Sequence, residues 1–218
     1  SLDPFKARLV GISLAVEPGH AAYIPLAHRY AGAPDQLRLE RVLDKLRPWL
    51  EGGQFAKLGQ HLKYDTHVLA NHGVRLGGIR HDTLLQSYVL ESHKSHDMDS
   101  LAERHLSIKT ISYDEVTGKG ASRIGFEQVA IERATEYAAE DADITLQLHQ
   151  ALYPQIEADA KLLHIYRDLE MPVMQILQTM ERHGVLLDTR LLAQLSREFG
   201  EKMMALETRA HEQAGQPF

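Results

Sequence analysis

Alternating and periodic apolar positions divide the first part of the chain into short strands and helices. Residues 8–16 and 21–26 read as strands around a hairpin-length turn at 17–20. Apolar residues at spacings of three and four predict a helix at 36–50, with Asp35 as its cap. The same patterns predict the remaining elements: strands at 55–59 and 79–82, and helices at 61–72, 83–90 and 126–152, the last in one or two pieces.

From residue 154 onward the pattern is helical throughout. Charged and apolar residues at helical spacing predict one long helix at 155–180, interrupted at Pro172, and another at 189–214. Nothing in these stretches indicates catalytic chemistry. We therefore expect one domain over 1–153 and the opening of a second, helical domain over 154–218.

Two carboxylates interrupt otherwise apolar helical stripes. Asp141 follows Tyr137 by one turn in a stripe of aliphatic residues, and Asp65 occupies a similar place on the helix at 61–72. A lone acid in such a stripe is costly to desolvate, so it normally has a partner, a metal ion or a water-filled cleft. Asp65 also fits a second role, as a negative charge near the positive end of its helix. Glu140 and Asp143 fit a solvated charge cluster.

Two further motifs are expected to serve the fold. Asp82 is predicted to cap the helix that follows it. Ser100 and Glu103 form a capping-box pattern, and this local role accounts for the neighbouring acids Asp97 and Asp99.

Composition and charge narrow the classes of function. The chain of 218 residues has a net charge of −6 and no cysteine, which excludes disulfides, thiolate nucleophiles and zinc–thiolate sites. Residues 126–170 hold ten acids and three bases, and such an acidic segment can recruit divalent cations that bridge to phosphate. Lys119 and Arg123, in a polar loop, are candidate phosphate contacts, with simple solvation as the alternative. Without a long apolar run or an export signal, we expect no membrane contact and a cytoplasmic location.

Several sequence blocks resemble a known family. The motifs GQHLKYD, HDMDSLAER and YAAEDADITLQLH, in that order, closely resemble the 3′-to-5′ proofreading exonuclease domain of bacterial DNA polymerase I. The later motifs EMP and MERHGVLLD resemble the start of that enzyme's polymerase domain. The blocks begin at residues 59, 96, 137, 170 and 180, so the resemblance covers essentially the whole chain.

The resemblance implies a fold, a cofactor and a reaction. Members of the family have a ribonuclease H-like α/β fold in which four acids and a tyrosine hold two divalent metal ions, Mg²⁺ or Mn²⁺, with Zn²⁺ as an alternative at one site. By resemblance, Asp65 and Asp141 are metal ligands and Tyr137 orients the attacking water. Two cations about 4 Å apart can activate water and stabilise the leaving 3′ oxygen, which agrees with this assignment.

The resemblance also implies a binding site for a single-stranded or frayed 3′ end of DNA. Leu2 and Phe126 would offer an apolar wedge or a stacking surface, although core packing is the alternative role for both. His61 stands where the family usually has asparagine. The matching residues are Leu2, Gln60, His61, Tyr64 and Phe126.

One departure from the family concerns the first motif. An Asp-x-Glu pair on a central strand should lie immediately before Ser1, so we expect this chain to be part of a longer protein. Other residues should replace that strand, or the sheet should show a gap. We expect weak or absent exonuclease activity from residues 1–218 alone.

Three functions therefore stay open. The first is a proofreading exonuclease module of a monomeric DNA polymerase, attached to the rest of the polymerase chain. The second is a non-catalytic domain that holds DNA or acts as a spacer, although the presence of Asp65, Tyr137 and Asp141 argues against it. The third is an RNA-trimming exonuclease similar to ribonuclease D, which the polymerase-like segment 170–188 makes the weakest of the three.

Overall fold

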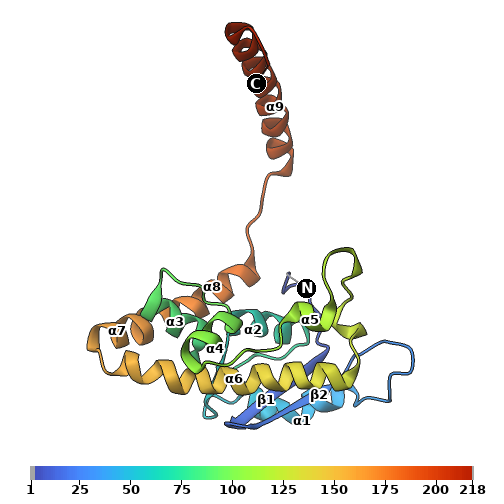
Figure 1. Cartoon of the computed structure of the whole chain (residues 1–218), viewed down its shortest axis with the longest axis vertical. Helices are drawn as coiled ribbons and strands as arrows, with labels where there is room; N and C mark the ends of the chain where they lie inside the picture. The colour runs from blue at the N-terminus through green and yellow to red at the C-terminus, as the bar shows by residue number, and fades with distance from the viewer. Residues whose placement is uncertain (1–2, 218) are drawn as a thin grey trace. The chain divides into compact units, whose positions relative to one another are not determined.

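The fold divides into two compact units that are joined after Arg182. The computed structural model describes residues 3–217, so the predicted contact residue Leu2 lies outside the described residues. The first unit extends to Arg182 and the second begins at His183 (Figure 1). Helices and strands alternate in the first unit, whereas the second contains a single long helix.

The strands form two separate sheets. β1 (Gly11–Glu17) pairs antiparallel with β2 (His20–Pro25), and β3 (Lys57–Gly59) pairs parallel with β4 (Ile79–Asp82). Within residues 3–217 the two sheets share no hydrogen-bonded strand pair. The strands expected from the sequence are confirmed, and among the described residues no further strand joins the two sheets.

The long helix α6 (Ile131–Glu157) connects most of the first unit. It packs on both strands of the β1–β2 hairpin and on the helices α3 (Thr83–Glu91) and α4 (Met98–Leu106). Leu148 and Leu152 are fully buried in this seam, and each contributes roughly 1.5–3 kcal/mol by leaving water. The helix is continuous and follows a short 3₁₀ turn, η2 (Phe126–Gln128).

The other helices of this region begin differently from the sequence prediction. α1 (Leu39–Glu51) follows Arg38 without a side-chain cap, so the assignment of Asp35 as its cap is wrong. α4 is capped by Asp97, whose carboxylate accepts a hydrogen bond from the Ser100 amide, so Ser100 does not cap a helix. The predicted loop at 111–123 contains the short helix α5 (Tyr113–Thr117) and a 3₁₀ turn, η1 (Gly120–Ser122).

Residues 155–182 belong to the first unit. Pro154 lies inside α6, and Pro172 is the second residue of α8 (Met171–His183), which follows a π-helical segment without a break. Between them run α7 (Ala160–His164) and the π-helical segment η3 (Ile165–Glu170). Met171 and Met174 are buried in one cluster with Tyr166, within the first unit. The first compact unit therefore ends at Arg182, although the sequence pattern changes at residue 154.

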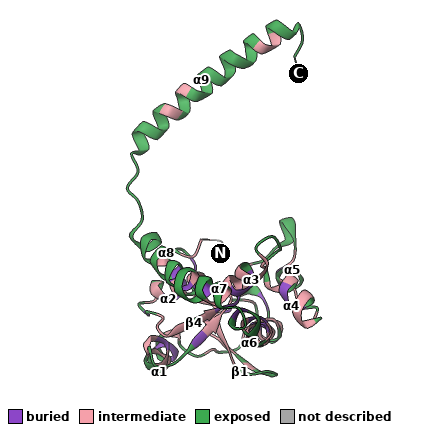
Figure 2. Ribbon diagram, turned by 90° about the vertical axis from the view of Figure 1, so that its left-hand side faces the viewer, coloured by how far each residue is buried: buried purple, intermediate pink, exposed green. Residues whose placement is uncertain are grey.

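The second unit presents an amphipathic helix without a covered face. Asp188 caps α9 (Thr189–Ala214), which has no buried residue (Figure 2). Leu191, Phe199 and Met203 are among its exposed apolar side chains. No helix within residues 3–217 is long and apolar enough to span a membrane.

A cluster of aromatic rings holds η3 against β4 and α6. The His81 ring lies 4.3 Å from the His149 ring and 4.5 Å from the Tyr153 ring, centroid to centroid. The Tyr166 hydroxyl accepts a hydrogen bond from the Asp82 amide at 3.0 Å. Burial and the neighbouring His149 lower the pKa of His81 to about 4.

This lowered pKa predicts a loss of stability in mild acid. The unfolded chain takes up a proton on His81 near pH 6.5, whereas the folded chain does so only near pH 4. Stability should therefore be complete above pH 6.5 and fall by roughly 1–3 kcal/mol toward pH 4 from this group. Urea unfolding at several pH values should show a shallower decline in His81→Gln than in the exposed-histidine control His20→Gln. Equal declines in both variants would contradict this role of His81.

Candidate functional site

Tyr137 and Asp141 form a pair on successive turns of α6. The Tyr137 hydroxyl donates a hydrogen bond to the Asp141 carboxylate. The other feature of this carboxylate is its Oδ1 atom, which is buried and has no hydrogen-bond partner among the described residues. A buried carboxylate oxygen without a donor is costly, and a cation or a bound water would satisfy it.

The surroundings of Asp141 favour its neutral form. Burial raises its pKa to about 7, the bond from Tyr137 opposes this rise, and the negative charges of Asp99 and Glu140 add to it. Asp99 was expected to serve only the fold. It does accept a hydrogen bond from the Thr110 hydroxyl at 2.7 Å, but it also contributes negative charge beside Asp141 and Tyr137.

Asp65 lies in the first turns of α2 (Leu62–Asn71), on a stripe whose leucines, Leu62 and Leu69, are buried. Water reaches its side chain, yet the surrounding protein and the nearby carboxylate of Asp82 raise its pKa to about 7. Because solvent contact remains, a cation can approach this carboxylate and stabilise its charged form.

A second acid, Asp82, fixes the start of α2. Its side chain is 1% exposed and accepts hydrogen bonds from the amides of His61 at 3.1 Å and Leu62 at 2.8 Å. It also accepts from the amides of Leu84 at 3.0 Å and Leu85 at 3.4 Å. The predicted cap of α3 is therefore confirmed, and the same carboxylate also caps α2, which carries Asp65.

Aromatic side chains connect the two helices that carry the acids. The rings of Tyr113 and Phe126 each lie beside that of Tyr137, at centroid distances of 6.2 and 5.8 Å. Tyr64, the neighbour of Asp65 on α2, is close enough to Tyr113 for the two hydroxyls to interact electrostatically. Tyr113 is thus the common neighbour of site residues on α2 and α6.

Tyr113 was not identified from the sequence. Its side chain is 40% exposed, whereas Phe126 and Tyr137 are half-buried beside the cluster of Val116, Val129 and Ala134. An exposed aromatic ring in a polar loop is the signal that was available, and it was treated as part of a solvated segment.

The remaining predicted contact residues occupy positions that the fold also constrains. Gln60 donates to the carbonyl of His96 at 2.8 Å and accepts from the Thr83 hydroxyl. His61 has a left-handed backbone with φ of 58°, and its exposed ring lies 6.3 Å from that of Tyr64. Asparagine and histidine both tolerate this conformation better than most residues, which explains how histidine can stand at a usual asparagine position.

Two charged groups have structural partners that the sequence did not suggest. Glu140 accepts a hydrogen bond from the Ile111 amide at 2.6 Å, and Asp143 accepts one from the Gly19 amide at 2.7 Å. The interpretation of these two acids as purely solvated is therefore wrong.

Lys119 and Arg123 both pair with Asp114, which reduces their availability for phosphate.

Two carboxylates among the described residues have, each taken by itself, the chemistry of a metal ligand. No group of three histidine, aspartate or glutamate side chains within residues 3–217 converges as a complete site. Asp141 nevertheless offers an unpaired buried oxygen, and Asp65 a solvent-accessible carboxylate. Each is an oxygen donor of the kind that divalent cations take in proteins.

Comparison with known proteins identifies the family. Residues 1–157 match the 3′-5′ exonuclease family of DNA polymerase A. The chain belongs to this family. DNA polymerase I of Pseudomonas aeruginosa is 51% identical over 221 residues, and that of Rhizobium leguminosarum is 37% identical over 236 residues. Each alignment covers 100% of this chain but 24% and 23% of the relative, so the chain spans about a quarter of their length.

Solved structures support the fold assignment. The POL domain of Pol1 from M. smegmatis, in complex with DNA primer-template and dNTP, has a TM-score of 0.67 at 21% identity. The match covers 97% of this chain and 34% of the Pol1 chain. Brucella melitensis NrnC has a TM-score of 0.57 at 18% identity and covers 82% of this chain and 77% of its own. The resemblance to the polymerase I exonuclease domain and the α/β fold are thus confirmed.

Removing the double cap should destabilise the exonuclease domain. In Asp82→Ala, four amides at the starts of two helices lose their acceptor, and we expect a loss of about 2–4 kcal/mol in the free energy of unfolding. Asp35→Ala is the matched control, because Asp35 is exposed and caps no helix, and it should change stability by less than about 0.5 kcal/mol. Chemical denaturation measures both, and similar small losses would contradict the capping role.

Proposed function

We propose that this exonuclease domain removes nucleotides from the 3′ end of DNA by metal-assisted hydrolysis, with Asp65 and Asp141 as metal ligands. The observation that carries the proposal is the buried, unpaired Oδ1 of Asp141 beside Tyr137. Family membership supplies the reaction class, hydrolysis of a phosphodiester bond.

The side chains of this chain have distinct tasks in that reaction. Bound divalent cations, Mg²⁺ or Mn²⁺ with Zn²⁺ as an alternative at one site, would activate water and stabilise charge on the leaving oxygen. Asp141 and Asp65 must ionise to hold them, and a nearby cation offsets the surroundings that raise both pKa values. Burial and Asp141 raise the pKa of Tyr137, so its hydroxyl stays protonated and orients the attacking water by hydrogen bonding.

Aromatic rings beside the acids would bind the substrate. Tyr113 and Phe126 offer ring faces near Tyr137, and bases of a single-stranded or frayed 3′ end stack on such surfaces. The phenol of Tyr64 interacts electrostatically with both Asp65 and Tyr113. Leu2, Gln60 and His61 are proposed further contacts on the basis of the family resemblance.

The wider setting of the domain is part of the proposal. Because the matched relatives are DNA polymerases, we place residues 154–218 at the start of a polymerase domain and expect a monomeric, cytoplasmic enzyme. The two further acidic ligands would come from the first family motif, on a strand that would fill the gap between the two sheets.

A pair of matched substitutions on α6 tests the catalytic assignment. Residues 1–218 would be extended at the N-terminus with the corresponding first-motif segment of the Pseudomonas aeruginosa relative. We expect this extension to confer Mn²⁺-dependent digestion of single-stranded DNA and Asp141→Asn to reduce it at least ~100-fold.

The control is Glu136→Gln, which removes an exposed carboxylate from the same helix and should leave the rate unchanged. DNA binding should persist in Asp141→Asn, because the aromatic surface is intact. Full digestion activity in Asp141→Asn, or no digestion activity in the extended chain, would refute the proposal.

The stacking role of Tyr113 predicts a defect in substrate binding. Tyr113→Ala in the extended chain should raise the KM for single-stranded DNA by roughly 5- to 100-fold, which corresponds to losing one stacked base. Tyr88→Ala is the control, since Tyr88 is 45% exposed and its ring contacts His96 instead of the site residues. Steady-state kinetics would show equal KM values if Tyr113 does not contact DNA.

A further inference from the structure

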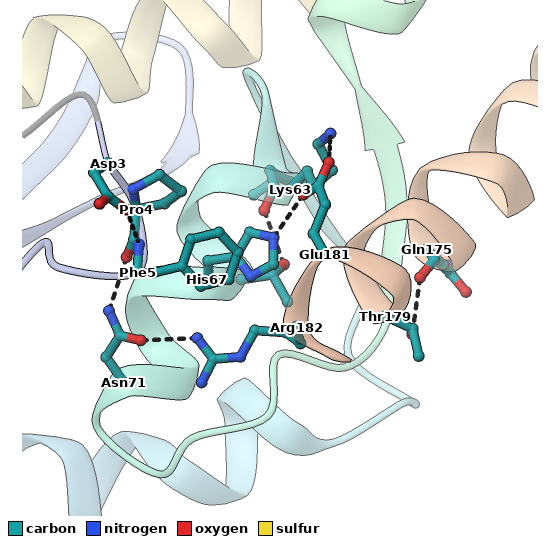
Figure 3. A network of polar contacts seen from close by, with 12 residues as sticks. Asp3, Pro4, Phe5, Lys63, His67, Asn71, Gln175, Thr179, Glu181 and Arg182 are labelled. Atoms are coloured by element: carbon teal, nitrogen blue, oxygen red, sulfur yellow. Dashed lines mark hydrogen bonds and ion pairs between the residues drawn. The ribbon is translucent and has the colours of Figure 1, made fainter. Parts of the chain in front are cut away.

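One face of α2 is bound by the last turn of α8. Lys63, His67 and Asn71 are four residues apart and therefore lie in line along the helix. Glu181 accepts from Lys63 Nζ at 2.6 Å and pairs with His67 Nε2 at 2.8 Å (Figure 3). Arg182 donates to Asn71 Oδ1 at 2.8 Å. We call these five residues the α2–α8 clasp.

The clasp also holds the N-terminal segment at residues 3–7. Asn71 donates to the carbonyls of Pro4 at 2.8 Å and Ala7 at 3.1 Å. The ring of Phe5 lies 4.6 Å from the His67 ring, and the Arg182 guanidinium lies 5.6 Å from the Phe5 centroid. Figure 3 shows Phe5 and Arg182 on the same side of α2 as His67.

Glu181 is the member of the clasp whose loss has the largest consequence. His67 is 1% exposed, so its Nε2 atom depends on this carboxylate as its partner. Glu181 bonds to two positions on α2, and the hydrogen bonds from Lys63 and then from His67 lower its pKa. Removing a partner from a buried polar atom costs more than the hydrogen bond itself contributes.

Asp65 lies between two of the residues that the clasp holds. It is two positions from both Lys63 and His67, which places it on a different face of the same rigid turn. Asp82 binds the first amides of α2, and the clasp binds one face of the same helix. Together these contacts determine the position of α2 and therefore that of the Asp65 carboxylate. A shift of a metal ligand by about 1 Å is enough to weaken a site.

We propose that Glu181 is a positioning residue for Asp65: by binding Lys63 and His67 it holds α2 in the place where Asp65 can ligate a divalent cation. This inference rests on the proposed role of Asp65 as a ligand. The proposal assigns a structural role to the end of α8, where the second unit begins at His183.

Mn²⁺ binding to a full-length DNA polymerase I that carries this sequence tests the proposal directly. Isothermal titration calorimetry should show a dissociation constant raised ~10-fold in Glu181→Ala, as expected when a residue that orients a ligand is lost. Lys63→Ala removes one arm of the clasp and should raise the constant less, which keeps the test informative if Glu181→Ala folds poorly. Glu157→Ala removes an exposed carboxylate at the end of α6 and should change nothing.

The exonuclease rate supplies a second readout. Saturating Mn²⁺ should return Glu181→Ala to within about twofold of the parent rate, because a displaced ligand weakens binding without removing chemistry. An unchanged dissociation constant in both Glu181→Ala and Lys63→Ala would overturn the inference. A rate deficit that persists at saturating Mn²⁺ would also overturn it.

The two proposals fail separately. A parent enzyme that binds Mn²⁺ but does not digest DNA would refute the proposed function, while the binding series would still decide the role of Glu181. A parent that digests DNA, with Mn²⁺ affinity unaffected by Glu181→Ala and Lys63→Ala, would refute the positioning role alone.

Discussion

The buried carboxylate of Asp82 is the constraint on which the arrangement of the site depends. Four amides from the starts of α2 and α3 converge on it, so two helices that are separate in sequence begin at one point. The amide of Asp82 itself binds the Tyr166 hydroxyl, which brings the π-helical segment to the same place. One residue, through its side chain and its own amide, therefore links β4, two helices and the segment that leads to α8.

The acids of the site are held under opposing conditions. Protein surroundings favour the neutral forms of Asp65 and Asp141, whereas metal binding requires the charged forms. In the proposed site a cation would thus contribute twice, by direct attraction and by cancelling the cost of desolvation. For the same reason the negative charge of Asp99 disfavours ionisation of the nearby Asp141.

Spacing along the chain was sufficient to identify the elements that bury apolar residues. The stripe on α6 is an example, because Ile144 and Leu148 are buried as their period requires and Asp141 stands out against them. The misplaced acids could be recognised for the same reason. Caps were harder to assign, since Asp35 and Ser100 have the right chemistry beside a helix that begins elsewhere.

Long-range polar contacts could not be predicted from local patterns. Glu140 and Asp143 look like solvated charges in sequence, yet each binds an amide from a distant loop. Glu181 lies in a charged helix end, and its partners on α2 are more than 100 positions away. Tyr113 gained its importance only when the fold placed it beside Tyr137 and Tyr64. Only tertiary structure brings such partners together.

The separation of the two sheets has a consequence for motion within the domain. β1 and β2 pack on α6, Ile12 of β1 packs against the core cluster of Leu43 and Leu69, and Gly19 donates to Asp143, but within residues 3–217 the two sheets share no backbone ladder. Opening the hairpin therefore breaks no hydrogen bond between β3 and β4. Regions with such independent ladders exchange their amide protons as separate cooperative units. The hairpin amides and those of β3 and β4 should therefore lose their protection at separate free energies.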